Sequence, residues 1–226
     1  PCHAGERCIV SALIASDVDG GPRRTMYLKL AALFTFPTEQ LLKSFSDGEW
    51  QSDVLACAQQ LGFSIPDLAT LDVDAVEYES EFIAMFEVGL GGAPCPLHSG
   101  HYARDRMRVM EEVLRFYRFF DYSPDRSADR FPDHVRFELE FMAHLAGLEG
   151  AATATGKDET SVVLAQRDFV SRNLENWLPE FGRQIEARTK IEFLKQVGRL
   201  VPFLITQDAD SLRQRVASTV PVEEGD

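Results

Sequence analysis

The fold is decided by one stretch of sequence, Phe131-Pro-Asp-His-Val-Arg-Phe-Glu-Leu-Glu-Phe-Met-Ala-His-Leu-Ala-Gly-Leu-Glu149. Its apolar residues recur at the three- and four-residue spacing of an α-helix, and they form two rows on different sides of it. The rows are Val135, Leu139, Met142 and Ala146, and Phe137, Phe141, Leu145 and Leu148. A helix that is apolar on nearly all sides is normally buried, so we expect this stretch to form the central helix of the protein.

The beginning of this stretch carries polar groups. Pro132 suits the first position of a helix, where its missing N–H costs nothing. Asp133 and His134 then fall in the first turn, at the positive end of the helix dipole, which stabilises a carboxylate and disfavours a protonated imidazole. Glu138 follows His134 by one helical turn and is placed to orient its ring. The sequence therefore predicts a buried helix that starts with an ionised acid beside a neutral histidine.

The composition is that of an ordinary globular protein with an excess of acidic residues. The chain of 226 residues is 45% hydrophobic and 26% charged, and its formal net charge is −13. This charge makes nucleic acid a poor partner and a basic peptide or protein a better one. The four cysteines show no paired framework, which is typical of a reducing compartment. No run of about 18 apolar residues is present, so we expect no membrane span.

Helical periodicity continues along most of the chain, and no alternating strand pattern of any length interrupts it. We expect an all-α fold, a single helical-bundle domain of about nine or ten helices. A mobile N-terminal arm is predicted for residues 1–22, the helical domain for 23–207 and a polar C-terminal tail for 208–226. Outside the central stretch, the helical patterns cover Pro22–Phe36, Thr38–Phe45, Ser52–Leu61, Leu71–Gly89, Arg104–Phe120, Val162–Leu178, Glu180–Arg188 and Lys190–Ile205, with Gly150–Glu159 as a linker and Pro179 and Pro202 as breaks or kinks.

The pair Arg23-Arg24, followed by an apolar run, has two interpretations. It resembles a twin-arginine export signal, which would make this protein itself an exported one. The other interpretation is an amphipathic first helix with Tyr27 on its apolar face. Lys29 interrupts the run and Pro37 ends it before any small-residue cleavage site, so we favour the helix.

The segment Leu71–Gly89 is a second amphipathic helix with clear end signals. Asp74 with Glu77 three residues later is a capping-box pattern at its beginning. Glu77 and Glu81 lie one turn apart as like charges, which slightly disfavours the helix. Its apolar stripe consists of Tyr78, Phe82, Met85 and Phe86.

Two groups of residues suggest metal chemistry. Cys95, His98 and His101 offer three possible ligands within one Gly/Pro-rich loop, but a structural zinc site normally has four, and the fourth would have to come from elsewhere. Adjacent Asp and His, as in Asp133-His134, occur in metal phosphohydrolases. A metal-dependent helical hydrolase that uses Asp133, His134 and this loop is therefore the alternative hypothesis.

Other catalytic patterns are missing from the sequence. It contains no serine or cysteine nucleophile motif, no phosphate-binding glycine loop and no dinucleotide fingerprint. We therefore expect a protein that is not an enzyme and that holds no metal or cofactor of its own.

Several motifs, taken in order, resemble those of one protein family. They are Glu77-Tyr-Glu-Ser-Glu-Phe-Ile-Ala-Met-Phe-Glu-Val-Gly89, Gly92-Ala-Pro-Cys-Pro-Leu97, Asp105-Arg-Met-Arg-Val-Met-Glu-Glu112 with Phe116-Tyr117, Pro132-Asp-His-Val135 and Glu138-Leu-Glu-Phe-Met142. The set resembles the redox-enzyme maturation chaperones of the TorD/DmsD/NarJ type, and most closely the subgroup that serves type II enzymes of the dimethyl sulfoxide reductase family. Where the family often has a glutamate shortly before Asp-His, this chain has Arg130-Phe131-Pro132.

The resemblance implies a TorD-like all-helical protein in the cytoplasm. It implies a chaperone without catalytic activity that binds the apo catalytic subunit of a molybdenum oxidoreductase, often at its twin-arginine leader peptide. Such a chaperone assists insertion of the molybdenum cofactor and holds back export until insertion is complete. The chain is expected to be a monomer or a domain-swapped dimer, with the loop 121–130 as a possible hinge.

A twin-arginine leader offers two guanidinium groups and an apolar segment, and carboxylates bind guanidinium groups through paired hydrogen bonds. We therefore expect Asp133, with Glu77 and Glu81, to face the arginines of such a peptide. His134 is expected to position Asp133 or to bind peptide backbone, with Glu138 behind it. The apolar part of the peptide site is expected to be lined by Tyr78, Phe82, Phe86 and Tyr102.

Overall fold

The computed structural model describes residues 21–87, 92–124 and 131–219. Every regular element within these ranges is helical, apart from one isolated β-bridge, so the predicted all-α fold is confirmed. The α-helices are α2 Gly21–Ala32, α3 Glu39–Ser46, α4 Glu49–Gln60, α5 Ala75–Phe86, α6 Arg106–Phe119, α7 Val135–Ala154, α8 Thr160–Phe169, α9 Glu175–Arg188 and α10 Glu192–Thr219; a 3₁₀ turn covers Ser99–Tyr102 and a π turn covers Val170–Leu174.

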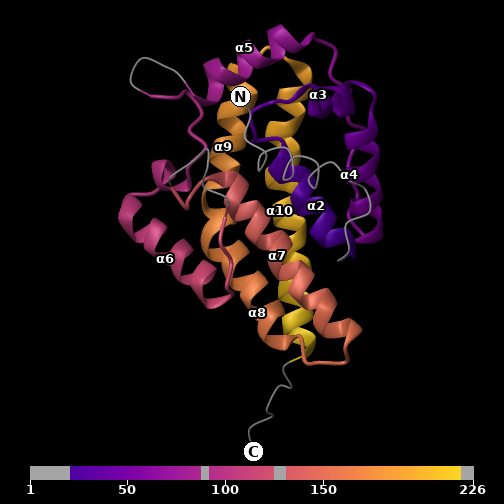
Figure 1. The fold of residues 1–226 in the computed structure, drawn as a ribbon, viewed down its shortest axis with the longest axis vertical. Coiled ribbons are helices and arrows are strands. Elements are labelled where there is room, and N and C mark those ends of the chain that lie inside the picture. Colours follow the sequence, from indigo (N-terminus) through magenta and orange to yellow (C-terminus); the bar gives the residue numbers. More distant parts are fainter. Residues whose placement is uncertain (1–20, 88–91, 125–130, 220–226) are drawn as a thin grey trace, which may run out of the picture.

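Helix α7 is the central helix, as its sequence predicts (Figure 1). One of its rows is fully buried at Val135, Leu139 and Met142. The other row is equally covered, since Phe137 and Phe141 are no more than 1% exposed. The helix packs against α2 on one side and α8 on another, which is why both of its apolar rows are buried. Helix α7 thereby lies between α2 and α8 and joins them in one bundle.

The ends of α7 differ from the prediction. The helix begins at Val135, with His134 as its N-cap, so Pro132 and Asp133 precede the helix instead of forming its first turn. A capping side chain competes successfully for the free N–H groups at this point, and the helix starts after it. At the other end the helix continues to Ala154, so the predicted linker at 150–159 begins later than expected.

Helices α9 and α10 form a close antiparallel pair that two glycines make possible (Figure 1). A Cβ atom on Gly182 would lie 2.1 Å from the carbonyl oxygen of Gly198, and a Cβ on Gly198 would lie 2.7 Å from that of Gly182. The predicted breaks at Pro179 and Pro202 do not occur, because both residues lie inside their helices. The π turn just before α9 is the kind of local adjustment that accommodates a proline.

Helices extend across the predicted boundaries at residues 22 and 207. Gly21 and Pro22 already belong to α2, and α10 continues without interruption to Thr219. Residues 1–20 of the predicted arm 1–22, and residues 220–226 of the predicted tail, lie outside the described residues. Helix α10 continues past residue 207 because Asp208, which looks like a polar tail residue in the sequence, is fully buried and belongs to the core.

Asp208 is the centre of a polar contact between the first and last helices. Its carboxylate accepts hydrogen bonds from Arg23 Nε and from the Tyr27 hydroxyl, both at 2.8 Å. Arg23 also lies 3.7 Å from the Glu149 carboxylate, in the C-terminal half of α7. Gln166 of α8 donates a hydrogen bond to this Glu149 carboxylate at 2.6 Å. Arg23 is thus an internal part of the bundle, which supports the interpretation of Arg23-Arg24 as part of a first helix.

None of the helices in the described ranges combines the length and the apolar character needed to cross a bilayer.

Replacement of Asp208 by alanine should destabilise the fold strongly. The variant leaves the largely buried guanidinium of Arg23 with only its 3.7 Å ion pair to Glu149, and removal of one member of a buried pair typically costs about 3–5 kcal/mol. Asp210→Ala is the matched control on the same helix, since its ion pair with Arg213 is largely exposed, and it should change stability by less than about 0.5 kcal/mol. The measurement is urea denaturation of both variants; equal losses would contradict the assigned role of Asp208.

Candidate functional site

The segment before α7 and the loop that contains Ser99 hold each other in place. The N–H of Val135 donates to the carbonyl of Leu97 at 2.8 Å, and the N–H of Ser99 donates to the carbonyl of Asp133 at 2.9 Å. These two bonds form an antiparallel β-bridge with His98 opposite His134. We call Asp133, His134, Glu138, His98 and Ser99 the α7 N-terminal cluster.

The carboxylate of Asp133 is fully buried and already has partners from its own chain. It accepts a hydrogen bond from the N–H of Gly100 at 3.1 Å, and its other oxygen lies 3.3 Å from Nδ1 of His98. Arg106 Nε lies 4.0 Å away. Burial raises the pKa of Asp133, but the His98 contact, the Gly100 N–H and the charge of Arg106 outweigh it and hold the pKa below its usual value.

Gly100 has a steric reason to be glycine. A Cβ atom at this position would lie 2.7 Å from the Asp133 carboxylate and 2.5 Å from Cγ of Arg106. The absence of a side chain therefore lets the backbone N–H approach the carboxylate while Arg106 packs beside it. The carboxylate of Asp133 is thus enclosed by Gly100, His98 and Arg106.

The sequence predicts that His134 positions Asp133 or binds peptide backbone. In the structure His134 caps α7, and His98 contacts the Asp133 carboxylate. The cap forms because Nδ1 of His134 accepts a hydrogen bond from the N–H of Arg136 at 3.1 Å. An Nδ1 that accepts a hydrogen bond carries no proton, so the predicted neutral histidine agrees with this geometry. The ring that contacts the Asp133 carboxylate is His98, which stands edge-to-face against His134 at 5.1 Å.

Glu138 lies one turn into α7 and is fully buried. The Ser99 hydroxyl donates to one of its oxygens at 2.6 Å, and Nε1 of Trp177 in α9 donates to the other at 3.1 Å. Burial raises the pKa of Glu138 to about 8, although both donors lower it. One carboxyl group thus connects the loop, the central helix and α9, and it holds a proton near neutral pH.

Tyr102 lies beside this cluster, against α9. Its hydroxyl donates to the carbonyl of Pro96 at 3.0 Å, and its ring packs on Trp177 at 5.2 Å and on Phe181 at 6.1 Å. The structure therefore brings together Asp133, His134, Glu138 and Tyr102 from the predicted set.

The other predicted residues lie on α5, at one end of the molecule (Figure 1). Tyr78, Phe82 and Phe86 are 1%, 2% and 5% exposed and belong to the core, so they do not line an open recess in this structure. They are covered because they pack against rings of other helices, such as Phe193 of α10.

The two acids of α5 are also apart from Asp133 in their contacts. Glu81 accepts a hydrogen bond from the Thr189 hydroxyl at 2.7 Å and one from the N–H of Lys190 at 3.2 Å, and it thereby fastens α5 to the turn between α9 and α10. Glu77 is exposed, and its N–H is capped by Asp74 at 2.9 Å, as the capping pattern predicts.

The loop that suggested a metal site has a different geometry. The Cys95 thiol is buried, and burial raises its pKa to about 11, which opposes the thiolate that zinc binds. His98 is directed at Asp133. Within the described ranges no group of three His, Cys, Asp or Glu side chains is arranged to hold a metal ion.

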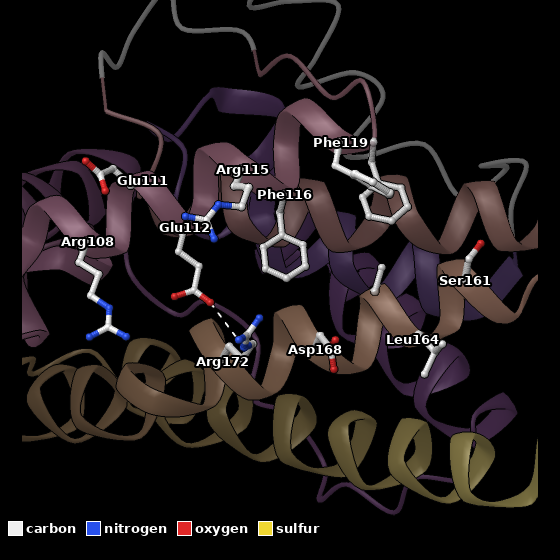
Figure 2. A pocket seen from close by; sticks show the side chains of 12 residues that line it. Arg108, Glu111, Glu112, Arg115, Phe116, Phe119, Ser161, Leu164, Asp168 and Arg172 are labelled. Atoms are coloured by element: carbon white, nitrogen blue, oxygen red, sulfur yellow. Dashed lines mark ion pairs between the residues drawn. The ribbon is translucent and has the colours of Figure 1, made fainter. Parts of the chain in front are cut away.

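A surface groove between α6 and α8 was not found from the sequence (Figure 2). Its volume is about 550 Å³, and none of the residues that line it belongs to the α7 N-terminal cluster. Its walls are made by Arg108, Glu111, Glu112, Arg115, Phe116, Phe119, Phe120, Ser161, Leu164, Ala165, Asp168 and Arg172. The only available signal was the run of aromatic residues at the end of α6.

Comparison with known proteins places the chain in a family. Residues 48–183, which include both the α7 N-terminal cluster and the groove, match the family described as nitrate reductase delta subunit. The chain belongs to this family. The resemblance to redox-enzyme maturation chaperones that the motifs indicated is thereby confirmed.

Individual relatives carry consistent names. The chain is 43% identical over 48% of its length to the selenate reductase assembly chaperone protein of Thauera selenatis, and 38% identical over 54% of its length to the chlorate reductase assembly chaperone protein of Ideonella dechloratans. These alignments span 58% and 66% of the relatives. A dimethyl sulfide dehydrogenase assembly chaperone protein from Rhodovulum sulfidophilum is 35% identical over 66% of this chain and 64% of its own. All three are named as chaperones and none as an enzyme, in agreement with the prediction.

One solved structure is similar over most of the chain. It is described as that of a redox enzyme maturation protein from Archaeoglobus fulgidus, with a TM-score of 0.47 and 16% identity, and the match covers 91% of this chain and 96% of the other.

Replacement of Glu138 by glutamine should flatten the dependence of stability on pH. Between the ordinary glutamate pKa and about 8, the folded protein holds a proton that the unfolded chain has lost. The stability of the native sequence therefore falls as the pH rises through this window, and the loss is complete above it. Glutamine does not titrate, and its oxygen can accept from Trp177 while its amide N–H donates to the Ser99 hydroxyl oxygen. Above this pH window the variant should therefore be more stable than the native sequence by about 1.4 kcal/mol for each unit of pKa shift that it removes.

The measurement is urea denaturation of Glu138→Gln and of the native sequence across this pH window. Glu111→Gln, on the exposed side of α6, is the matched control and should keep the native profile. A native-like decline in Glu138→Gln would show that another group titrates.

Proposed function

We propose that this protein is a cytoplasmic chaperone for the catalytic subunit of a molybdenum oxidoreductase of the dimethyl sulfoxide reductase family. It binds the apo subunit together with its twin-arginine leader peptide, assists insertion of the cofactor and holds back export. The observation that carries this proposal is the family match over residues 48–183, together with relatives named for the assembly of selenate reductase, chlorate reductase and dimethyl sulfide dehydrogenase. The net charge of −13 supports a client segment that contains arginines.

The α7 N-terminal cluster supports a more specific proposal for the leader arginines. Arg106 lies 4.0 Å from the Asp133 carboxylate, too far for a hydrogen bond, and its buried Nε has no hydrogen-bond partner in the described part of the chain. The contact between Arg106 and Asp133 is therefore an incomplete ion pair. An arginine with a better approach would form the stronger, bidentate pair and replace it. We propose that Arg106 occupies the position that a leader guanidinium takes, and that Asp133 accepts the leader in its place.

Binding of a leader-like peptide should respond in opposite directions to two substitutions. Arg106→Gln removes the internal competitor and should raise affinity, whereas Asp133→Asn removes the acceptor. Loss of one partner of a desolvated charge pair typically costs about 2–5 kcal/mol, which is more than about tenfold in affinity. The probe is a synthetic peptide with two adjacent arginines followed by an apolar segment, titrated by calorimetry.

The exposed Arg104→Gln is the matched control for charge on the same segment and should leave the affinity unchanged. A peptide with two lysines should bind more weakly, since an ammonium cannot form the bidentate pair. Unchanged affinity in Asp133→Asn would remove this acid from the site, while the chaperone function would stand on other contacts.

The function itself is tested by identifying the client. The affinity-tagged chain, expressed in its native cell and purified under mild conditions, should bring down a molybdoenzyme catalytic subunit that lacks its cofactor. Depletion of the chaperone should lower the cofactor content and the activity of the same subunit. Recovery of no molybdoenzyme subunit would contradict the proposed function.

A further inference from the structure

The groove between α6 and α8 presents an apolar floor to solvent (Figure 2). On the α6 side, Phe116 packs edge-to-face on Phe169 at 5.2 Å and is fixed by the core beneath it. Phe119 is 80% exposed, and its ring rests on Phe120 at 4.9 Å. On the α8 side, Leu164 continues the floor. An exposed aromatic surface at the edge of an open hollow is characteristic of a site that another molecule covers.

The rim of this groove carries three arginines and three acids, and two of the acids, Glu112 and Asp168, already form ion pairs with Arg172 and Arg167. Arg108, Arg115 and Glu111 are left without an ion pair among the described residues, so the unpaired charge is positive on balance. Helix α6 has four arginines and two glutamates, so it is positively charged in a chain whose net charge is −13. Arg172 faces Arg108 and Arg115 from the other wall, 3.5 Å from Glu112 in a pair that is largely open to solvent. The rim can therefore pair with carboxylates of an incoming molecule.

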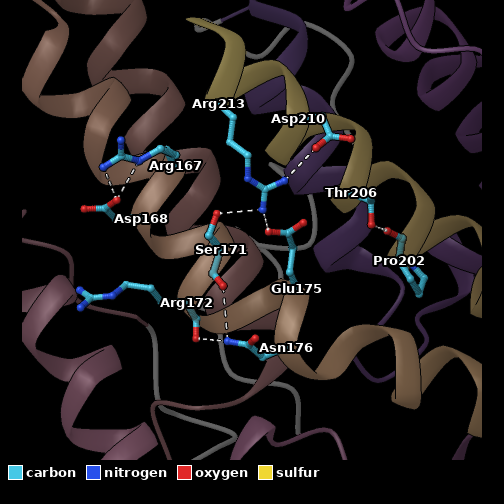
Figure 3. A network of polar contacts seen from close by, with 10 residues as sticks. All are labelled: Arg167, Asp168, Ser171, Arg172, Glu175, Asn176, Pro202, Thr206, Asp210 and Arg213. Atoms are coloured by element: carbon cyan, nitrogen blue, oxygen red, sulfur yellow. Dashed lines mark hydrogen bonds and ion pairs between the residues drawn. The ribbon is translucent and has the colours of Figure 1, made fainter. Parts of the chain in front are cut away.

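The wall that carries Arg172 is an irregular but fixed part of the structure. Arg172 belongs to the π turn Val170–Leu174, and π turns within helices are frequent at functional sites. Arg213 of α10 bonds the Ser171 hydroxyl and pairs with Glu175, so it ties both ends of the turn to the core helix pair (Figure 3). Asn176 holds the carbonyl of Arg172 itself. The turn thus presents the Arg172 side chain to the groove from a rigid backbone.

We propose that this groove binds an apolar segment flanked by carboxylates, from the mature part of the client catalytic subunit. The proposal rests on the proposed function, which supplies the client. The floor of Phe116, Phe119 and Leu164 takes the apolar side chains, and Arg108 and Arg115 take the carboxylates. The adjacent arginines of a leader peptide would meet like charges here, so the groove selects a segment other than the leader.

Two synthetic peptides with the same apolar stripe test the selection directly. One carries glutamates beside the stripe and the other carries lysines at the same positions, and both are titrated by fluorescence anisotropy against the full chain. The glutamate peptide should bind at least about tenfold more tightly. Arg115→Glu should reverse the preference, whereas Arg118→Glu, a matched charge reversal on the same helix outside the groove, should leave it unchanged.

The apolar floor is tested with Phe119→Ser, whose ring is exposed and whose loss leaves the core intact. This variant should weaken both peptides, while Met107→Ser, an exposed apolar residue of α6 outside the groove, should weaken neither. Thermal melting of each variant confirms that the fold is unchanged. Equal binding of the two peptides, or a preference that Arg115→Glu does not alter, would overturn the proposal.

Two further outcomes would assign the groove to a different occupant and also overturn the proposal. If Phe119→Ser converts a dimer to a monomer in sedimentation velocity, a second copy of the chain covers the groove. If deletion of residues 220–226, which include Glu223 and Glu224, raises peptide affinity about tenfold or more, the chain's own end competes for it.

Failure of this proposal can be told apart from failure of the proposed function. The purified chain is also titrated with the catalytic subunit that the pull-down identifies, with and without its leader. If Arg115→Glu leaves both affinities unchanged, the groove is not the site and the chaperone function stands. If no molybdoenzyme subunit is recovered, the function fails whatever the peptides do.

Discussion

The fold around the functional region depends on one buried carboxyl group. Glu138 lies inside the central helix with no access to water, and a buried carboxyl group is tolerated only when hydrogen-bond donors are supplied to it. Ser99 and Trp177 are those donors, so the loop and α9 have to meet α7 at this residue. Asp133 fixes the same loop a second time through the N–H of Gly100. These bonds fix the loop in addition to the apolar contacts of Cys95, Leu97 and Tyr102.

The two proposals assign opposite charge preferences to two regions of the molecule. In the α7 N-terminal cluster the Asp133 carboxylate lies beside Arg106 of the same chain, and in the groove arginines lie at the rim above an aromatic floor. A client with a basic leader and an acidic mature segment could occupy both without competition between them. Two weak contacts on one chain reinforce each other through effective concentration, so neither site needs high affinity alone. This suits a chaperone that has to release its client after assembly.

The sequence predicts the helices well and their contacts only in part. The apolar rows of α7 identify the central helix because burial on all sides leaves a periodic pattern. Asp208 is misassigned because a single acid in a polar stretch looks solvated until its partner, Arg23, is known to lie beside it. The contact between His98 and Asp133 is missed for the same reason, since the loop has no periodicity that would place it.

The candidate binding residues show the same limit. Asp133, His134, Glu138 and Tyr102 come together because hydrogen bonds hold the loop that carries Tyr102 to the beginning of α7. Phe82 and Phe86 carry an equally clear pattern, but their rings are used for packing. The groove leaves only the run of aromatic residues at the end of α6 as a pattern, and that run does not show that Phe119 stays uncovered. Periodicity shows which side chains are apolar, whereas only the assembled helices show which of them stay uncovered.

The difference in accessibility between the two regions implies an order of binding. The groove is open in this structure, whereas Asp133 is enclosed, so under the two proposals a client would meet the groove first. A ligand shifts a conformational equilibrium only as far as it binds one state more tightly than the other. In one state here Asp133 pairs with Arg106, and in the other it pairs with a better-placed guanidinium of the leader. The displaced Arg106 would add an unpaired charge to the helix that carries Arg108 and Arg115. Occupation of Asp133 would therefore strengthen the hold of the groove on carboxylates, and by linkage an occupied groove would favour the exchange at Asp133.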